Sequence, residues 1–215
     1  MKRFLSESLE EYEESEFRDL DLPQRRIVCN RFYECRFHNC NFNEVTFENC
    51  RFVDCEFSVC NLSLVGFRKN CGFVDTRFTG SKMVGINWNE VSWPDIQLAS
   101  PLQFDECDIS SSTFMGLSLR EMVVTRCRAR DVDFREAVLS HADFTYTDLM
   151  KSLFNGTDLT EADFVNATNY SIDVAFNGVF FQCLMVVEPV AHRCEIEVPE
   201  AREGKNYVEE SGNEE

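Results

Sequence analysis

Large apolar residues recur at every fifth position along most of this chain. Their register runs over residues 17–67, resumes one residue late over 73–98, and resumes one residue late again over 104–164. Ala129 is the one register position that is not a large apolar residue, and 16 of the 20 Phe lie in register. A helix face repeats near 3.6 residues and a strand face at two. A five-residue period therefore predicts a solenoid that turns a corner each time, so that these side chains share one axis.

A second position, two residues before each register position, is also small or apolar. The three residues between are mostly polar and are expected to face water. Eight of the 11 Cys occupy this second position: Cys35, Cys40, Cys50, Cys55, Cys60, Cys71, Cys107 and Cys127. Zinc sites favour C-x₂₋₄-C pairs grouped in fours, whereas these cysteines follow the repeat. We interpret them as small buried hydrophobic residues and predict no metal site.

Two segments carry a family resemblance. Residues 142–146 (ADFTY) and 162–166 (ADFVN) resemble the A(D/N)(L/F)XX unit of pentapeptide-repeat proteins. The resemblance implies an all-β fold, a right-handed quadrilateral β-helix with four pentapeptides per coil. Positions four repeats apart would then stack, and one aromatic column would comprise Phe32, Phe52, Phe73, Trp93, Phe114, Phe134 and Phe154. The breaks near 68–72 and 99–103 each add one residue in this register, so we expect small corner bulges and no long projecting loop.

The chain is predicted to have four parts. Residues 1–16 form an acidic N-terminal cap, in which 5–14 is expected to be a short helix because serines precede several glutamates. Residues 17–174 form the β-helix, and 200–215 form a disordered acidic tail.

Residues 175–199 form a C-terminal cap and dimer segment. This stretch is apolar and out of register, which is consistent with a cap folded over the last coil or with a two-fold dimer contact. The dimer is favoured because related proteins pair through this end. The interface residues would be Phe180, Phe181, Leu184, Met185, Val186, Val187 and Val190.

The net charge of −17 is spread unevenly. The N-terminal cap carries −4 and the segment 175–215 carries −6, which leaves −7 on the rod. A polyanion disfavours direct binding to nucleic acid or to an anionic membrane, but it suits basic protein partners. The first residues contain no apolar run that could serve as a signal peptide, and no stretch approaches the ~18 apolar residues that a membrane span needs. We therefore expect a cytoplasmic protein with reduced thiols.

Two acidic groups are candidate partner-binding surfaces. Counting by coils aligns Glu34, Asp54, Asp75 and Asp95, which we call the acidic column. Either Arg31 and Arg51 neutralise it locally, or it imitates a phosphate backbone. The second group comprises Asp105, Glu106 and Asp108, and we expect it to pair with the basic run Arg126, Arg128 and Arg130 one coil further on.

Nothing in the sequence indicates an enzyme. His38 and His141 fall at outward repeat positions, and no phosphate loop, nucleophile elbow, zinc-protease or dinucleotide motif is present. We predict no catalytic residue and no cofactor, and interpret the protein as a binding module.

Further segments narrow the resemblance to the albicidin- and fluoroquinolone-resistance group of pentapeptide-repeat proteins. These are 60–64 (CNLSL), 83–88 (MVGINW), 93–94 (WP), 114–117 (FMGL) and 169–173 (NYSID). Members of that group are similar in shape to duplex DNA and act on DNA gyrase or topoisomerase IV. The resemblance implies a dimeric, anionic, DNA-mimicking rod that protects such an enzyme from an inhibitor. The alternative is a structural scaffold for a partner that is not a topoisomerase.

Overall fold

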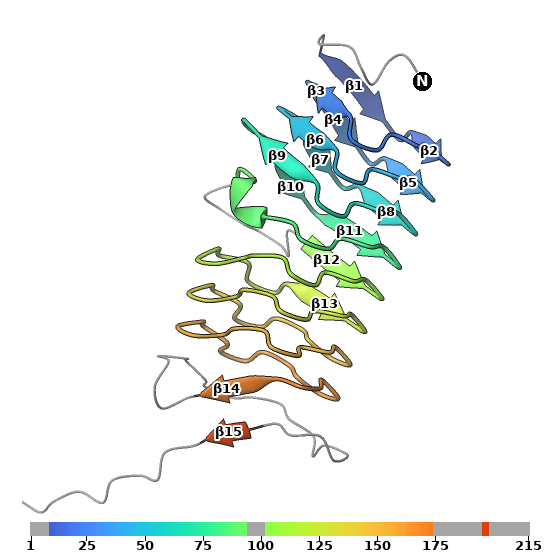
Figure 1. Ribbon diagram of the computed structural model, residues 1–215. Coiled ribbons are helices and arrows are strands. Elements are labelled where there is room, and N and C mark those ends of the chain that lie inside the picture. Colours follow the sequence, from blue (N-terminus) through green and yellow to red (C-terminus); the bar gives the residue numbers. More distant parts are fainter. Residues whose placement is uncertain (1–8, 94–101, 174–194, 198–215) are drawn as a thin grey trace, which may run out of the picture.

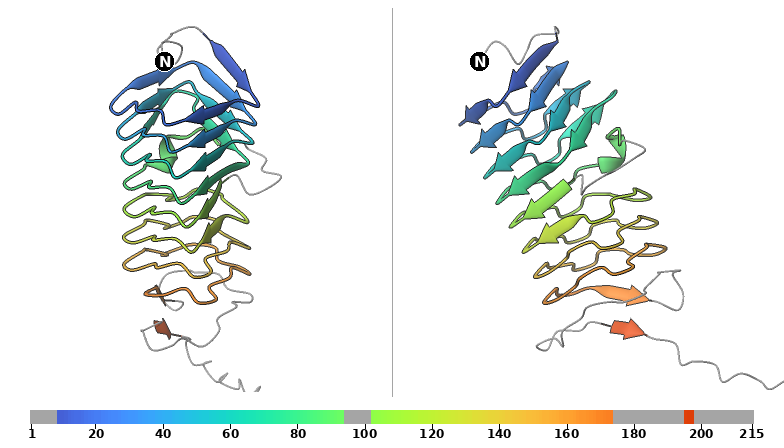
Figure 2. Two further views of the ribbon diagram at one scale, coloured as in Figure 1. Left: turned by 90° about the vertical axis from the view of Figure 1, so that its right-hand side faces the viewer. Right: turned by 180° about the vertical axis from the view of Figure 1, so that it is seen from behind.

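The computed structural model describes residues 9–93, 102–173 and 195–197. These residues wind into a rod of stacked coils, with the N-terminal coil at one end and strand β14 near the other (Figures 1 and 2). Strands on successive coils pair in parallel, usually with the residue four repeats further on, as Phe37 does with Phe57. The predicted all-β, right-handed quadrilateral β-helix is confirmed.

Three sides of the rod are parallel sheets. The first sheet contains β1 (Glu10–Glu13), β4 (Asn30–Tyr33), β7 (Arg51–Val53) and β10 (Gly72–Val74). The second sheet contains β2 (Glu16–Arg18), β5 (Arg36–His38), β8 (Glu56–Ser58), β11 (Thr76–Thr79), β12 (Leu102–Asp105) and β13 (Val123–Thr125). The third sheet contains β3 (Arg26–Val28), β6 (Thr46–Glu48) and β9 (Gly66–Arg68).

The remaining elements are short. The fourth side is held by single parallel bridges such as Asn41 with Asn61, and bridges of this kind also carry most of the coils after β12. A 3-10 helix, η2 (Trp88–Glu90), precedes the second break. Near the C-terminal end, β14 (Ser171–Asp173) pairs in parallel with β15 (Glu195–Glu197).

A left-handed residue makes most of the described corners. Two positions after a register residue, the backbone repeatedly adopts a positive φ, for example 53° at Glu34, 53° at Asn49 and 55° at Val59. This conformation is disfavoured for residues other than Gly, Asn and Asp. It is retained here because the corner N–H bonds to the next coil, as Glu34 N–H does to the Val53 carbonyl at 2.9 Å.

The cysteines at the second inward position are buried, as predicted, but they also form hydrogen bonds. Cys40 N–H donates to Cys60 Sγ (3.4 Å), and Cys60 N–H donates to Ser81 Oγ (3.0 Å). The same chain of contacts continues through Cys107 and Cys127 to Thr147 Oγ1. Thiol and hydroxyl groups therefore accept the same backbone hydrogen bond at this position. Every cysteine in the described part of the chain is a free thiol.

The first break adds one residue, as predicted, but the second adds six. Phe52 pairs with Phe73, one position beyond the regular coil length, whereas Phe78 pairs with Phe104, six positions beyond it. The chain is still in register at residue 92, because Ser92 N–H bonds to the Cys71 carbonyl at 2.7 Å. The additional residues therefore lie between Trp93 and Leu102, and the one-residue bulge expected there is wrong.

The long aromatic column is consequently two columns. Tyr12, Phe32, Phe52 and Phe73 stack with centroid spacings of 5.3, 5.0 and 4.9 Å. Phe114 stacks on Trp88 at 5.7 Å, not on Trp93, and this second column continues through Phe134 to Phe154 at 5.3 and 5.2 Å. The five-residue register in the sequence did not reveal the six added residues, because adding six residues shifts the register by the same single position as adding one.

The predicted N-terminal helix is wrong over its described part. Residues 10–13 form β1, which pairs with β4, and Tyr12 occupies a register position five residues before Phe17. Exposed Glu11 and Glu13 alternate with half-buried Glu10 and Tyr12 along β1, which is a strand pattern. Ring stacking and sheet hydrogen bonds outweigh the weak helix preference of a few glutamates. Residues 1–8 lie outside the described residues.

At the C-terminal end, burial continues beyond Phe164. Ala167, Tyr170 and Ile172 are 6%, 2% and 1% exposed. The predicted dimer residues 180–190 and the tail 200–215 lie outside the described residues, so both predictions remain open.

Candidate protein-interaction surface

The acidic column exists as predicted over its described members. Glu34, Asp54 and Asp75 occupy the left-handed corner that follows the first sheet on three consecutive coils, with φ of 53°, 52° and 47°. All three side chains are exposed. Parallel strands lie ≈ 4.8 Å apart, so the three carboxylates form a line along the rod. Asp95 lies outside the described residues.

The expected local neutralisation by arginine is not made. Among the described residues, no ion pair or side-chain hydrogen bond includes Glu34, Asp54 or Asp75. Arg31 instead pairs with Glu11 at 3.0 Å. Arg31 and Arg51 lie three residues before the corner on β4 and β7, which places them about 10 Å away at ~3.3 Å per residue.

An open groove of about 410 Å³ runs beside the acidic column. Its other side is formed by Arg36, Glu56 and Arg77 of the second sheet. Arg36 lies 3.8 Å from Glu56, and Arg77 donates to Gln103 Oε1 at 3.1 Å. The groove cations therefore already have partners. Like charges ~5 Å apart in water repel by about 1 kcal/mol. The carboxylates of the acidic column therefore repel one another, and a basic partner would reduce this repulsion.

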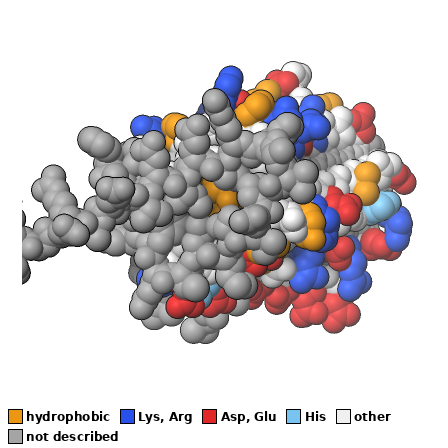
Figure 3. Space-filling view, turned by 90° about the horizontal axis from the view of Figure 1, so that it is seen from below, with side chains coloured by type: hydrophobic (Ala, Val, Ile, Leu, Met, Phe, Trp, Pro, Cys, Tyr) orange, Lys and Arg blue, Asp and Glu red, His pale blue; other side chains and the backbone are white. Residues whose placement is uncertain are grey.

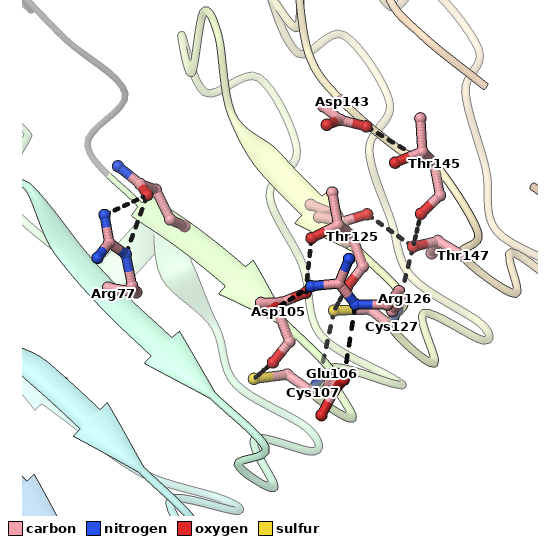
Figure 4. A network of polar contacts seen from close by, with 12 residues as sticks. Arg77, Asp105, Glu106, Cys107, Thr125, Arg126, Cys127, Asp143, Thr145 and Thr147 are labelled. Carbon is pink, nitrogen blue, oxygen red and sulfur yellow. Dashed lines mark hydrogen bonds and ion pairs between the residues drawn. The ribbon is translucent and has the colours of Figure 1, made fainter. Parts of the chain in front are cut away.

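The second acidic group is separate from the column, and its three acids share two arginines, Arg126 and Arg128. Asp105 ends β12, and it accepts hydrogen bonds from Thr125 Oγ1 at 2.8 Å and from the Arg126 guanidinium (Figure 4). Arg126 also lies 3.6 Å from Glu106. The pKa of Arg126 is raised, chiefly by the hydrogen bond to Asp105. The structure therefore does not bring Asp105 and Glu106 together with Glu34, Asp54 and Asp75.

Arg126, Arg128 and Arg130 each pair with an acidic side chain, but the partner of Arg130 differs from the prediction. Arg128 lies 3.4 Å from Asp108, but Arg130 pairs with Asp148 at 2.6 Å. Although burial opposes it, hydrogen bonds from Asn169 and Arg130 lower the pKa of Asp148. Seen from the C-terminal end, acidic and basic side chains are interspersed on the part of the rim that is visible (Figure 3). The arginines Arg126, Arg128 and Arg130 of the later coils are therefore paired, although residues 102–173 carry 13 acidic and six basic side chains, a net charge of −7.

The corner that carries the acidic column has further members that sequence counting missed. Glu14, Glu121 and Glu161 occupy the equivalent left-handed position on other coils. His141 stands between the last two, with Nδ1 3.1 Å from Glu161 Oε2. A count that allowed six added residues at the second break would have aligned these positions. His141 is exposed as expected, whereas His38 is half-buried and lies 3.0 Å from Ser58 Oγ.

Sequence reasoning also missed an ion-pair network at the first break. The Glu48 carboxylate is 6% exposed, and it pairs with Arg26 at 2.7 Å and with Lys69. Hydrogen bonds from Lys69 and Arg26 hold the pKa of Glu48 below its ordinary value. The one sequence feature that could have indicated this network is the residue added at the first break, beside Lys69. These charges are mutually satisfied, so the network is structural.

The described residues hold no obvious chemical centre. They contain no group of three or more His, Cys, Asp or Glu side chains placed to hold a metal ion. No helix long and apolar enough to span a bilayer occurs in the part of the chain that the structure describes.

Comparison with known proteins establishes the family. The pentapeptide repeat region model matches residues 30–100 and 86–164, which is more than half of the chain. The chain therefore belongs to the pentapeptide-repeat family. No curated protein is significantly similar to it in sequence.

Solved structures of other pentapeptide-repeat proteins also match this chain. Full-length QnrB1, a plasmid-mediated fluoroquinolone resistance protein, is 15% identical, with 78% of this chain and 93% of that chain covered and a TM-score of 0.48. HetL, involved in heterocyst differentiation regulation in the cyanobacterium Nostoc sp. strain PCC 7120, is 14% identical, with 84% and 93% covered and a TM-score of 0.27. The family assignment rests on the pentapeptide repeat region model and not on these structures.

Proposed function

We propose that this protein is a DNA mimic that binds DNA gyrase or topoisomerase IV in the bacterial cytoplasm and protects it from an inhibitor. The observation that supports this most directly is the acidic column, whose described carboxylates have no cationic partner in the described chain. One DNA strand carries a phosphate every ≈ 3.4 Å along the axis. The column carries a carboxylate about every 4.8 Å, which is a similar linear charge density.

The family resemblance supplies the choice of partner. A topoisomerase holds DNA on a basic surface, and a straight acidic rod offers such a surface a set of carboxylates in place of phosphates. Binding through these contacts releases counterions and should weaken as salt rises. The protein would act by occupying the DNA-binding surface, without chemistry of its own, which agrees with the absence of catalytic motifs in the sequence.

A supercoiling assay tests the proposal. Purified protein is titrated into gyrase with and without albicidin or a fluoroquinolone, and supercoiling and cleavage complexes are measured. We expect the protein to lower the yield of inhibitor-stabilised cleavage complexes. If neither supercoiling nor cleavage nor inhibitor sensitivity changes at micromolar protein, the topoisomerase role is wrong and the scaffold alternative stands.

A further inference from the structure

The outer surface of the first sheet carries three straight columns of different chemistry. Arg31 and Arg51 are register neighbours and form a basic column. Tyr33, Val53 and Val74 are also in register and form a half-buried apolar column. The acidic column follows at the corner. Every coil of this sheet from β4 to β7 therefore presents a base, an apolar side chain and an acid, in that order.

Most charges of this surface are left unsatisfied. Within the described ranges, Arg51 makes no ion pair or side-chain hydrogen bond, and neither does Glu34, Asp54 or Asp75. At other corners, successive coils make polar contacts with one another. Asn39 donates to Asp19 at 2.6 Å, for example. On the first sheet, Arg51 and the acidic column thus line opposite margins without meeting, while Arg31 is paired with Glu11 on β1 of the same sheet.

The direction of a two-fold axis determines which columns meet when this surface packs against the same surface of a second copy. A two-fold axis parallel to the rod places the basic column of one copy opposite the acidic column of another, because rotation exchanges the two margins. A two-fold axis across the rod would instead place base on base and acid on acid. The columns of two copies also share one coil spacing, so every pair along the rod meets at the same time.

We propose that the outer surface of the first sheet is a self-complementary interface at which a second copy of this chain docks side by side and parallel. Arg51 of each copy pairs with Asp54 of the other, and Arg31 exchanges its contact with Glu11 for one with Glu34 of the other copy. Tyr33, Val53 and Val74 of the two copies pack beside one another between the charged margins. This interface is distinct from the C-terminal dimer segment expected from the sequence, and it goes beyond the proposed function.

The pairing is expected to be transient. The surface is roughly 10 Å wide and spans only a few coils at ~4.8 Å each, which is below the ~800 Å² per partner of stable complexes. The net charge of −17 also opposes association of two copies. At physiological ionic strength the Debye length is about 8 Å, so the long-range repulsion is screened while the contacting pairs are not. Because the interface uses the acidic column, self-association would compete with a basic partner.

A charge exchange tests the proposal on the full chain. Sedimentation equilibrium is measured at physiological salt from low micromolar to near-millimolar protein. We expect a concentration-dependent dimer for the unaltered chain. Arg51→Asp and Asp54→Arg should each raise the dissociation constant by about tenfold or more, because close interfacial charge pairs couple by ≈ 1.5 kcal/mol or more. The double variant should restore association, since each exchanged base again faces an exchanged acid.

The matched controls are Arg128→Asp and Asp108→Arg, which alter an exposed ion pair on another side of the rod. We expect both to leave the dissociation constant unchanged. Circular dichroism and the urea midpoint verify that each variant is folded. A monomer at all concentrations would overturn the proposal, and so would a dimer that is indifferent to Arg51 and Asp54 or a double variant that fails to recover. No topoisomerase is present, so this result is independent of the proposed function.

Discussion

The coils before and after the second break build the same interior from different residues. Up to residue 93 cysteine is the commonest residue at the second inward position, whereas between 102 and 173 most of these positions hold alanine, serine or threonine. The later coils also use aspartates as turn acceptors, as Asp143 Oδ1 accepts from Thr145 N–H at 2.8 Å (Figure 4). The earlier coils are regular strands at the same places. Different residue types can therefore fill the same interior positions. This difference in the interior does not indicate a difference in function between the two halves.

The exteriors differ in a way that bears on binding. Arginines of the later coils pair with aspartates, whereas the acidic column of the earlier coils is unpaired in the described structure. Residues 17–93 carry nine acidic and ten basic side chains, whereas 102–173 carry 13 and six, so the net negative charge of the rod lies in the later coils while the unpaired acidic column lies in the earlier coils. We expect a basic partner to bind the earlier coils because the carboxylates of the acidic column are unpaired there, and not because those coils carry more net charge.

The largest expected effect concerns the core. Phe52 stacks between Phe32 and Phe73, whereas Leu139 occupies the same column in the later coils. We expect Phe52→Ala to lower the free energy of unfolding by about 3–5 kcal/mol and Leu139→Ala by about 2–5 kcal/mol. Urea denaturation measures both. A loss below about 1 kcal/mol for Phe52→Ala would contradict the stacked interior.

The Glu48 network should make the earlier coils sensitive to acid. Because its pKa is lower in the folded than in the unfolded chain, the pairing stabilises above the unfolded value of about 4.3 and is lost as pH falls through the folded value. We expect Glu48→Gln to reduce stability at neutral pH and this difference to close at low pH. Asp133→Asn should show a smaller difference, because the Asp133 side chain is 22% exposed against 6% for Glu48. A pH-independent difference for Glu48→Gln would contradict this account.

The inward hydrogen-bond chain predicts which cysteine replacements are tolerated. Ser81 and Thr147 already stand in line with Cys60 and Cys127 and make the same contacts. Cys60→Ser and Cys127→Ser should therefore be close to neutral, while Cys127→Ala should cost about 1 kcal/mol for the lost hydrogen bond. Thermal denaturation compares the three variants. Equal losses for serine and alanine would show that the thiol acts only by its volume.

The smallest effects belong to the corners. Val59 is a β-branched residue at φ 55°, and its side chain is 57% exposed. Val59→Asn should raise the free energy of unfolding by up to about 1 kcal/mol, since asparagine tolerates this conformation. Tyr146→Asn in the later coils should gain less, because tyrosine is not β-branched. A destabilised Val59→Asn protein would indicate that Val59 makes packing contacts that outweigh its strain.

Much of this fold could be predicted because one residue type repeats one role. The Phe register determined the axis, and the burial of Cys35, Cys50 and Cys55 followed from their spacing. Two features of the fold were not predicted. The six added residues before Leu102 were misread because a shift of six resembles a shift of one in a five-residue period. β1 was mistaken for a helix because Tyr12 was not recognised as a register residue.

The acidic column was predictable for a geometric reason, and its lack of partners was not. Counting by coils places Glu34, Asp54 and Asp75 on one corner, which needs no side-chain detail. Whether Arg31 reaches them depends on which margin of the strand it occupies and on the alternative partner Glu11. Such choices among nearby charges are decided by contacts a few ångströms long, which sequence spacing does not resolve.

Gyrase affinity in two triple variants tests the central claim most directly. One variant neutralises the acidic column (Glu34→Gln, Asp54→Asn, Asp75→Asn), and the other removes three paired acids (Asp105→Asn, Glu106→Gln, Asp108→Asn). We predict that the first variant loses affinity for gyrase and shows a shallower salt dependence, while the second stays close to the unaltered protein. Equal losses in the two variants, or a loss confined to the second, would contradict the assignment of binding to the acidic column.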